Sequence, residues 1–121
     1  MANLEGQTEV VPFVKSLTAL QGWRLYERVP FNAWIREITV HWPSGCKGLV
    51  DVAVGYEHIR LLPSKEELQG VLYLSLDDIT LRYPFREPVT ADQHLWCEML
   101  NADSQQPHKI TVTILLEKRT A

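Results

Sequence analysis

The side chains of this sequence that could do chemistry are few and widely spaced. The four histidines are His41, His58, His94 and His108. No two of them stand at a metal-ligand spacing such as His-x-His or His-Glu-x-x-His, and the chain has no Cys-x-x-Cys. A metal site would have to be assembled from distant strands, for example from His41, His58 and Asp51. We favour histidines on outward strand positions and in loops, and we expect no metal, no cofactor and no catalytic residue.

The acidic pair Asp77-Asp78 is the sharpest cluster of carboxylates in the chain. Such a pair could help to hold calcium or supply acid–base chemistry. Its neighbours Leu76 and Ile79 are apolar, however, and a calcium loop needs more oxygen ligands close by. Aspartate is typical of turns because its side chain accepts hydrogen bonds from nearby backbone amides. We therefore expect a turn at this position.

The two cysteines do not form a disulfide framework. Cys97 stands inside an alternating run and is expected to be a small core residue. Cys46 lies in the turn-like segment Pro43–Gly48, where no orienting base is near it in the sequence. The sequence also lacks a Gly-x-Ser-x-Gly motif and a glycine-rich phosphate loop. We expect two unpaired thiols and no nucleophile.

Aromatic side chains offer a further kind of chemistry. The four tryptophans are Trp23, Trp34, Trp42 and Trp96. They could form a stacking platform for sugars, and Trp96 is the best candidate because its neighbours Leu95 and Cys97 take the inward side of the strand. The alternative, which we favour, is that they lie in the core or at subunit contacts, where large aromatic residues are enriched.

The elements that must position these residues are β-strands. Apolar residues alternate with polar ones in six runs: 37–42, 50–54, 72–76, 79–83, 95–99 and 110–117. Such period-two runs bury one face of each strand, which is typical of antiparallel sheets. Residues 23–29 form the first convincing strand, and 59–62 is a short run that ends at Pro63. Pro84 and Pro88 are expected to bracket a sharp change of direction. One helical turn is expected at 64–69, with Ser64 as its N-cap.

These features predict a single all-β domain. A chain of 121 residues suits one domain with its own core. Short strands separated by regular turn signals predict an antiparallel β-sandwich, and the jelly roll is the topology we favour, although the pattern does not determine the strand order. We expect residues 1–22 to form an N-terminal arm, in which Glu9–Val14 could pair as an edge strand weakened by Pro12, and residues 23–121 to form the sandwich.

Several apolar side chains are expected on the outside of this sandwich. The candidates for an interface or ligand surface are Trp96, Leu115, Trp34, Tyr83 and Phe85. Tyr83 and Phe85 flank Pro84 and are expected on the two sides of a bend. Exposed apolar surface on a small protein usually marks association, so we expect a homo-oligomer of three or more chains.

Charge and hydropathy argue against nucleic acid and membrane as partners. The net charge is −3, so the chain lacks the basic footprint of a nucleic-acid-binding protein. No apolar stretch approaches the length of a membrane span, and no secretory signal precedes the first strand. We expect synthesis in the cytoplasm, with protein partners.

Four segments carry a resemblance to a known class of protein. They are Ile38–Pro43, Gly48–Val54, Leu76–Ile79 and Pro107–Ile114. Across residues 34–117 their order resembles the small jelly-roll proteins of viral and phage particles. The resemblance implies a virion-associated domain that decorates a capsid, cements capsomers or forms a fibre head as a trimer or pentamer. It carries over no catalytic residues.

Three functions follow from these observations. The first is a non-catalytic structural or assembly protein, such as a capsid decoration protein, whose edge strands Trp23–Val29 or Ile110–Glu117 pair across subunit boundaries. The second is a carbohydrate-binding module, which requires solvent-facing tryptophans. The third is a small cupin-like metal-dependent enzyme, which requires histidines that converge inside the barrel.

Overall fold

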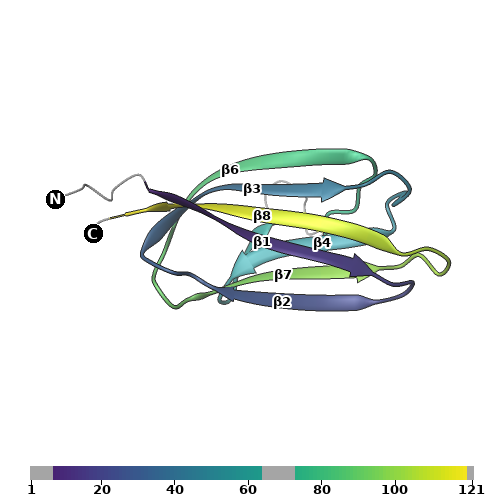
Figure 1. The fold of residues 1–121 in the computed structure, drawn as a ribbon, viewed down its shortest axis with the longest axis horizontal. Coiled ribbons are helices and arrows are strands. Elements are labelled where there is room, and N and C mark those ends of the chain that lie inside the picture. The colour runs from purple at the N-terminus through teal and green to yellow at the C-terminus, as the bar shows by residue number, and fades with distance from the viewer. Residues whose placement is uncertain (1–6, 64–72, 120–121) are drawn as a thin grey trace.

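The computed structural model describes residues 7–63 and 73–119 and contains eight β-strands (Figure 1). The strands are β1 (Thr8–Leu17), β2 (Gly22–Arg28), β3 (Ala33–Trp42), β4 (Val50–Tyr56), β5 (Ile59–Leu62), β6 (Ile79–Val89), β7 (His94–Asn101) and β8 (His108–Lys118). The described part of the chain has no helix of the length and hydropathy that crossing a membrane would take.

The strands form two antiparallel four-stranded sheets that pack face to face. One sheet has the order β1-β8-β3-β6 and the other has the order β2-β7-β4-β5. Strands that follow one another in the chain therefore pass from sheet to sheet, except at the β4–β5 hairpin. This strand order is that of an eight-stranded jelly roll, so the predicted all-β sandwich is confirmed and its topology is settled.

The core lies between the two sheets and follows from the period-two pattern. On β8 the inward side chains are fully buried from Ile110 to Leu116, whereas Thr111, Thr113 and Leu115 between them are half-buried on the outer face. The central strand β3 behaves in the same way, with Ile38, Val40 and Trp42 buried. The indole Nε1 of Trp42 donates to the carbonyl oxygen of Val50 at 3.1 Å, which satisfies its one polar atom inside the core.

The described part of the N-terminal segment, from residue 7 onward, does not form an arm outside the domain. Residues 8–17 are β1, which pairs with β8 over its full length from Thr8↔Glu117 to Leu17↔His108. Val11, Phe13 and Leu17 on this strand are buried in the core. The predicted boundary at residue 23 is therefore corrected, because the sandwich already includes β1. Pro12 is tolerated because β1 is an edge strand, where a missing amide donor costs no ladder hydrogen bond.

The other prolines follow the same rule. Pro84 and Pro88 lie within β6, which is one continuous strand at the opposite edge of that sheet. The sharp change of direction predicted there is therefore wrong. Pro84 pairs with Glu37, at the point where the register between β3 and β6 shifts after Ile35. An edge position beside a register shift lets proline remain inside a strand.

Three further sequence predictions have different outcomes. The run 72–76 is not a strand in the described residues, where Leu74 makes only an isolated bridge with Val52. The helical turn expected at 64–69 lies outside the described residues. Ile110–Glu117 was expected as an edge strand, but β8 lies between β1 and β3 and both of its edges are occupied. The other expected edge strand, β2, does lie at an edge.

A polar contact joins the two sheets. The hydroxyl of Tyr56 on β4 donates to Oε2 of Glu87 on β6 at 2.7 Å. Burial, together with this bond to a carboxylate, raises the pKa of Tyr56 to about 12. Both effects favour the protonated phenol in the folded protein.

This contact predicts a loss of stability in alkali. Since the pKa of Tyr56 is higher in the folded state than in the unfolded state, its contribution is complete below the unfolded value near 10 and is lost as the pH rises towards 12. We expect Tyr56→Phe to lower the free energy of unfolding by about 1–2 kcal/mol at neutral pH. The difference from the wild type should shrink between pH 10 and 12 in urea titrations. Glu87→Gln, which keeps an acceptor oxygen for the Tyr56 hydroxyl, is the control. If the difference in unfolding free energy between the wild type and Tyr56→Phe stayed the same at high pH, this account would be contradicted.

Candidate functional site

The outer face of the β2-β7-β4-β5 sheet carries a hollow formed by rows of cross-strand neighbours. One row is Tyr26 on β2, Trp96 on β7 and Gly55 on β4. The adjacent row is Arg24, Glu98 and Ala53. These side chains share a face because alternate residues of each strand point away from the core. Six residues line the hollow, which has a volume of about 410 Å³: Arg24, Tyr26, Glu57, His58, His94 and Trp96.

Trp96 forms the floor of the hollow and is only 5% exposed. Its indole lies over Gly55, and a Cβ atom at position 55 would stand 2.5 Å from Cζ2 of Trp96. The guanidinium of Arg24 lies over the ring system, 4.5 Å from the ring centroid. Nε1 of Trp96 donates to the carbonyl oxygen of Glu57 at 3.0 Å. The ring is thus held by Gly55 and Arg24 and at its one polar atom.

The rim of the hollow combines an exposed aromatic ring with charged and polar groups. Tyr26 is 56% exposed, and His94 meets it edge-on with the ring centroids 6.5 Å apart. Oε1 of Glu57 accepts the backbone amide of His94 at 2.8 Å and lies 3.8 Å from Nδ1 of the same residue. His58 is exposed in the turn between β4 and β5. The rim therefore offers hydrogen-bond acceptors and donors beside one aromatic face.

Arg24 is held in place by its neighbours. Its Nη1 lies 3.2 Å from Oε2 of Glu98 on the neighbouring strand. The other carboxylate oxygen of Glu98 accepts the hydroxyl of Tyr73. This second bond and burial raise the pKa of Tyr73, so the phenol stays protonated as a donor. These contacts therefore hold the side chains on the outer face of this sheet in place before any ligand binds.

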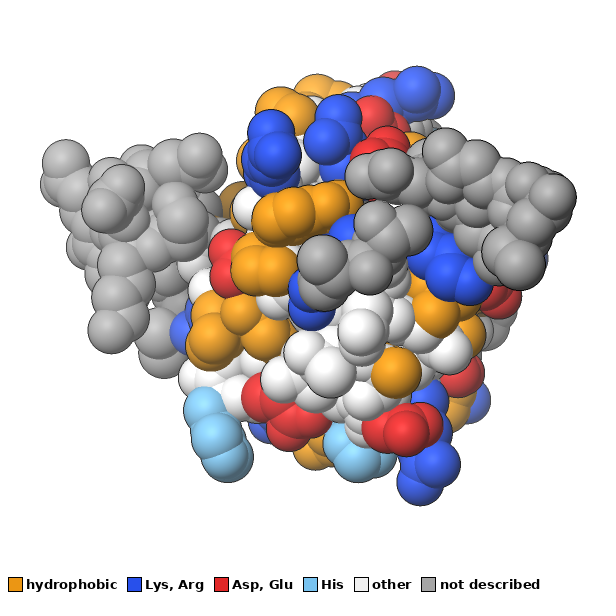
Figure 2. All heavy atoms as spheres, turned by 90° about the vertical axis from the view of Figure 1, so that its left-hand side faces the viewer, with side chains coloured by type: hydrophobic (Ala, Val, Ile, Leu, Met, Phe, Trp, Pro, Cys, Tyr) orange, Lys and Arg blue, Asp and Glu red, His pale blue; other side chains and the backbone are white. Residues whose placement is uncertain are grey.

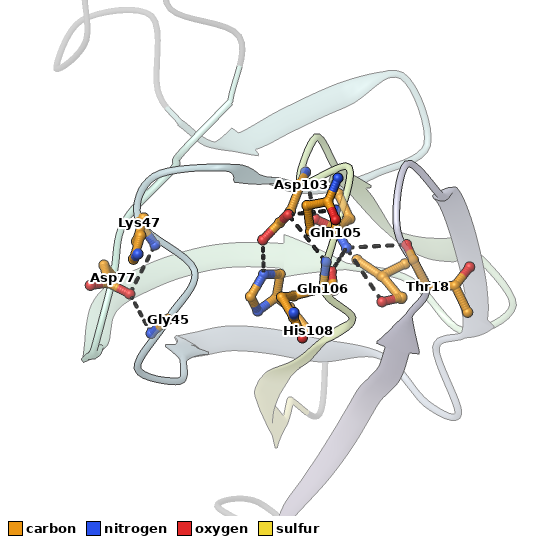
Figure 3. Close-up of polar contacts among 10 residues, drawn as sticks. Thr18, Gly45, Lys47, Asp77, Asp103, Gln105, Gln106 and His108 are labelled. Carbon is orange, nitrogen blue, oxygen red and sulfur yellow. Dashed lines mark hydrogen bonds and ion pairs between the residues drawn. The ribbon is translucent and has the colours of Figure 1, made fainter.

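A second polar cluster lies at the end of the sandwich where the β7–β8 loop turns (Figure 3). Nε2 of His108 lies 2.8 Å from Oδ2 of Asp103, and both side chains are largely buried. This hydrogen bond and the backbone amide of Gln105 hold the pKa of Asp103 below its usual value. Asn101 is buried beside them, and its amide group donates to the carbonyl oxygens of Thr18 and Gln106 at 3.1 Å each. The cluster closes the loop onto the β1–β2 connection.

The expected turn at Asp77-Asp78 is present and its first carboxylate is used structurally. Oδ1 of Asp77 accepts the backbone amides of Gly45 and Lys47 at 3.0 and 2.9 Å (Figure 3). Gly45, Lys47 and Asp78 all have positive φ, as tight turns require. Asp77 thus ties the segment before β6 to the β3–β4 loop.

Both thiols are free, buried and poorly ionised. Burial raises the pKa of Cys97 to about 12, and its place in the core confirms the sequence prediction. Burial and the nearby carboxylates of Asp77 and Asp103 raise the pKa of Cys46. Since the thiolate is the nucleophile, neither thiol is activated at neutral pH.

The five predicted surface residues divide into three groups. Trp96 does face outward, as the alternation predicted, but Arg24 covers it. Leu115 and Trp34 are half-buried on the outer face of the β1-β8-β3-β6 sheet. Tyr83 and Phe85 pack against the core, so their predicted outward placement is wrong. They are two residues apart on one uninterrupted strand and therefore share its inner face.

The tryptophans do not form a shared platform. Trp42 is in the core, and each of the other three has a cation over its ring. Lys15 lies 4.0 Å from the ring centroid of Trp23, and Arg86 lies 5.0 Å from that of Trp34. The rings belong to different strands of both sheets.

The distant-strand metal site does not assemble. His41 on β3 forms a hydrogen bond with Thr80 at 2.7 Å. Asp51 lies on β4, in the other sheet, and accepts a hydrogen bond from the hydroxyl of Ser75. His58 is at the hollow. Within residues 7–63 and 73–119, no three histidine, cysteine or acidic side chains gather as metal ligands would.

Most of the hollow was not predicted from the sequence. Along residues 23–26, period two puts Trp23 and Leu25 on one face and Arg24 and Tyr26 on the other, but no local pattern shows that β7 is the neighbour of β2. The signal that was available is Gly55, a glycine inside a strand run, which often marks a close approach by another group.

Comparisons with known proteins identify the fold. No protein-family model matches the chain, and no curated protein matches it by sequence. A chain of the cyanophage Pam1 capsid asymmetric unit is similar in structure, with a TM-score of 0.54 and 11% identity over 98% of this chain and 90% of that one. FLHE is similar with a TM-score of 0.47 and 7% identity, over 93% of this chain and 98% of that one. At this low identity the first likeness supports the jelly-roll fold.

Proposed function

We propose that this protein is a non-catalytic structural protein of a virion that works through contacts between subunits. The observation that carries the proposal is the jelly-roll order of the strands together with the likeness, over nearly the whole chain, to a chain of a phage capsid asymmetric unit. Fold alone is weak support for a function, so the surfaces of the chain must also suit assembly.

The surface that suits assembly is the outer side of β1 and its neighbour β8. Val10 is 55% and Val14 is 45% exposed on this side of β1. Leu115 on β8 stands directly opposite Val10 in the ladder. An edge strand with exposed valines offers both apolar side chains and unpaired backbone groups to a second chain. The occupant we propose is a second copy of this chain.

The remaining chemistry is compatible with a non-catalytic role. The two cysteine thiols are buried with raised pKa values. The best-buried histidine, His108, is engaged with Asp103 in closing a loop. The thiols are thus unreactive and His108 has a structural partner, which supports a protein that works through its surfaces.

The mass in solution tests the proposal. Light scattering coupled to size exclusion at micromolar concentration should give three or more times the chain mass of 13.9 kDa. Val14→Glu should weaken the association more than tenfold, because an unpaired carboxylate buried at an interface costs at least about 2 kcal/mol.

The matched control is Ile59→Glu. Ile59 is also 45% exposed and lies on β5, an edge strand of the other sheet. This variant should keep the wild-type mass. A monomeric wild type, or an equal loss of mass in both variants, would overturn the proposed interface.

A further inference from the structure

We propose that the hollow between β2, β7 and the β4–β5 turn binds a pyranose sugar. This site lies on the sheet that the proposed assembly surface does not use. The proposed sugar site can therefore be tested independently of the assembly function.

The size and the aromatic side chain of the hollow suit one sugar ring. Its volume of about 410 Å³ lies within the usual range of roughly 300–1,000 Å³ for small-molecule sites. Tyr26 projects from the edge strand β2 with more than half of its surface exposed. The apolar C–H face of a pyranose can pack on such a ring, which offers a large rigid surface at a low cost in conformational entropy.

The polar groups of the rim suit hydroxyls better than an anion. A sugar hydroxyl both donates and accepts hydrogen bonds. The Glu57 carboxylate accepts, whereas the Arg24 guanidinium donates and the two histidines can do either. An anionic ligand would meet the Glu57 carboxylate directly. The Arg24 charge is also already paired with Glu98. A neutral polyol satisfies this mixed set without an unpaired charge.

The floor of the hollow is rigid before binding. Trp96 is packed against Gly55 and Arg24, and its Nε1 is bonded to the Glu57 carbonyl. The Glu57 side chain is in turn bonded to the His94 amide. A ligand would therefore pay little to order these side chains, which is the condition under which a shallow site can bind.

The hollow opens at an accessible end of the molecule. Glu57 and His58 form the β4–β5 turn, and His94 begins β7 beside it. Figure 2 shows histidine and acidic side chains together on the lower rim of this end. A sugar at the end of a longer glycan could reach the site from solvent.

Saturation-transfer NMR on the full chain tests the proposal. The probes are the methyl pyranosides of glucose, galactose, mannose and N-acetylglucosamine, each at millimolar concentration. At least one should receive saturation from the protein and should quench or shift the tryptophan fluorescence. Tyr26→Ala and Glu57→Gln should each weaken that binding at least tenfold, whereas Tyr26→Phe should keep most of it.

These variants separate loss of the site from loss of the fold. Glu57→Gln keeps the Oε1 acceptor for the His94 amide, so the turn should remain closed. Ile59→Glu lies outside the lining and should bind as the wild type does. Val14→Glu should also bind normally, even where it abolishes assembly. Silence from all four probes, or binding that Tyr26→Ala and Glu57→Gln leave unchanged, would overturn the proposal.

Discussion

Trp42→Ala is expected to lower the free energy of unfolding by about 3–5 kcal/mol, which is a large part of the stability of a domain of this size. Trp42 is fully buried at the end of β3, and its Nε1 donates to the Val50 carbonyl across the core. Truncation leaves a cavity and an unpaired carbonyl oxygen, and a close-packed interior cannot collapse to fill the space. Equilibrium unfolding in urea measures the change.

The same substitution at the other end of β3 is the matched control. Trp34 is half-buried on the outer face, where Arg86 lies 5.0 Å from its ring centroid. Trp34→Ala removes surface packing and a cation–π contact, so we expect a loss of about 1 kcal/mol. Equal losses in the two variants would contradict the assignment of the two faces of β3.

Gly55→Ala is expected to cost at least about 2 kcal/mol and to disturb the hollow at the same time. The new Cβ would stand 2.5 Å from Cζ2 of Trp96 and would meet the backbone oxygen of Ile59 even more closely. The backbone of the β4–β5 bulge cannot move aside as a flexible side chain can. Urea unfolding should show the loss, and the tryptophan emission of the folded variant should differ from that of the wild type.

Gly22→Ala is the matched control for this prediction. Gly22 lies on the edge strand β2, where a Cβ would stand 2.7 Å from Cδ2 of Leu100, the far end of a flexible side chain. We expect a change within about 1 kcal/mol, since alanine also restricts the unfolded chain. Gly55→Ala with wild-type stability and emission would show that Trp96 does not need a glycine beneath it.

The two proposals concern opposite faces of one sandwich. The valines of β1 and Leu115 lie outside one sheet, and the sugar hollow lies outside the other. A protein that assembles through the first face would leave the second face exposed. Each proposal can therefore be tested with variants that leave the other surface intact.

The class of fold could be predicted from the sequence alone. The alternation in β3 and β8 is strong because each of these strands has one face buried in the core, and burial selects residue types at every second position. The same pattern correctly placed Cys97 in the core and Trp96 on the opposite face. The turn at Asp77-Asp78 was likewise predictable, from the tendency of aspartate to accept hydrogen bonds from backbone amides.

Strand neighbours were decided only by the tertiary structure. Prolines in β1 and β6 suggested an arm and a bend, but proline is allowed inside a strand wherever no neighbour needs its amide. That depends on which strands are at the edges, and no local pattern reports it. The wrong placement of Tyr83 and Phe85 has the same cause, because a bend was predicted at Pro84 and β6 instead continues through it as an edge strand.

The hollow shows this division most clearly. Period two indicated that Arg24, Tyr26 and Trp96 point away from the core, because they alternate with the apolar residues Trp23, Leu25, Leu95 and Cys97. Only the pairing of β2 with β7 and of β7 with β4 brought these side chains together over Gly55. A sequence specifies which face a side chain takes through local burial, whereas contacts between distant strands depend on the packing of the whole chain.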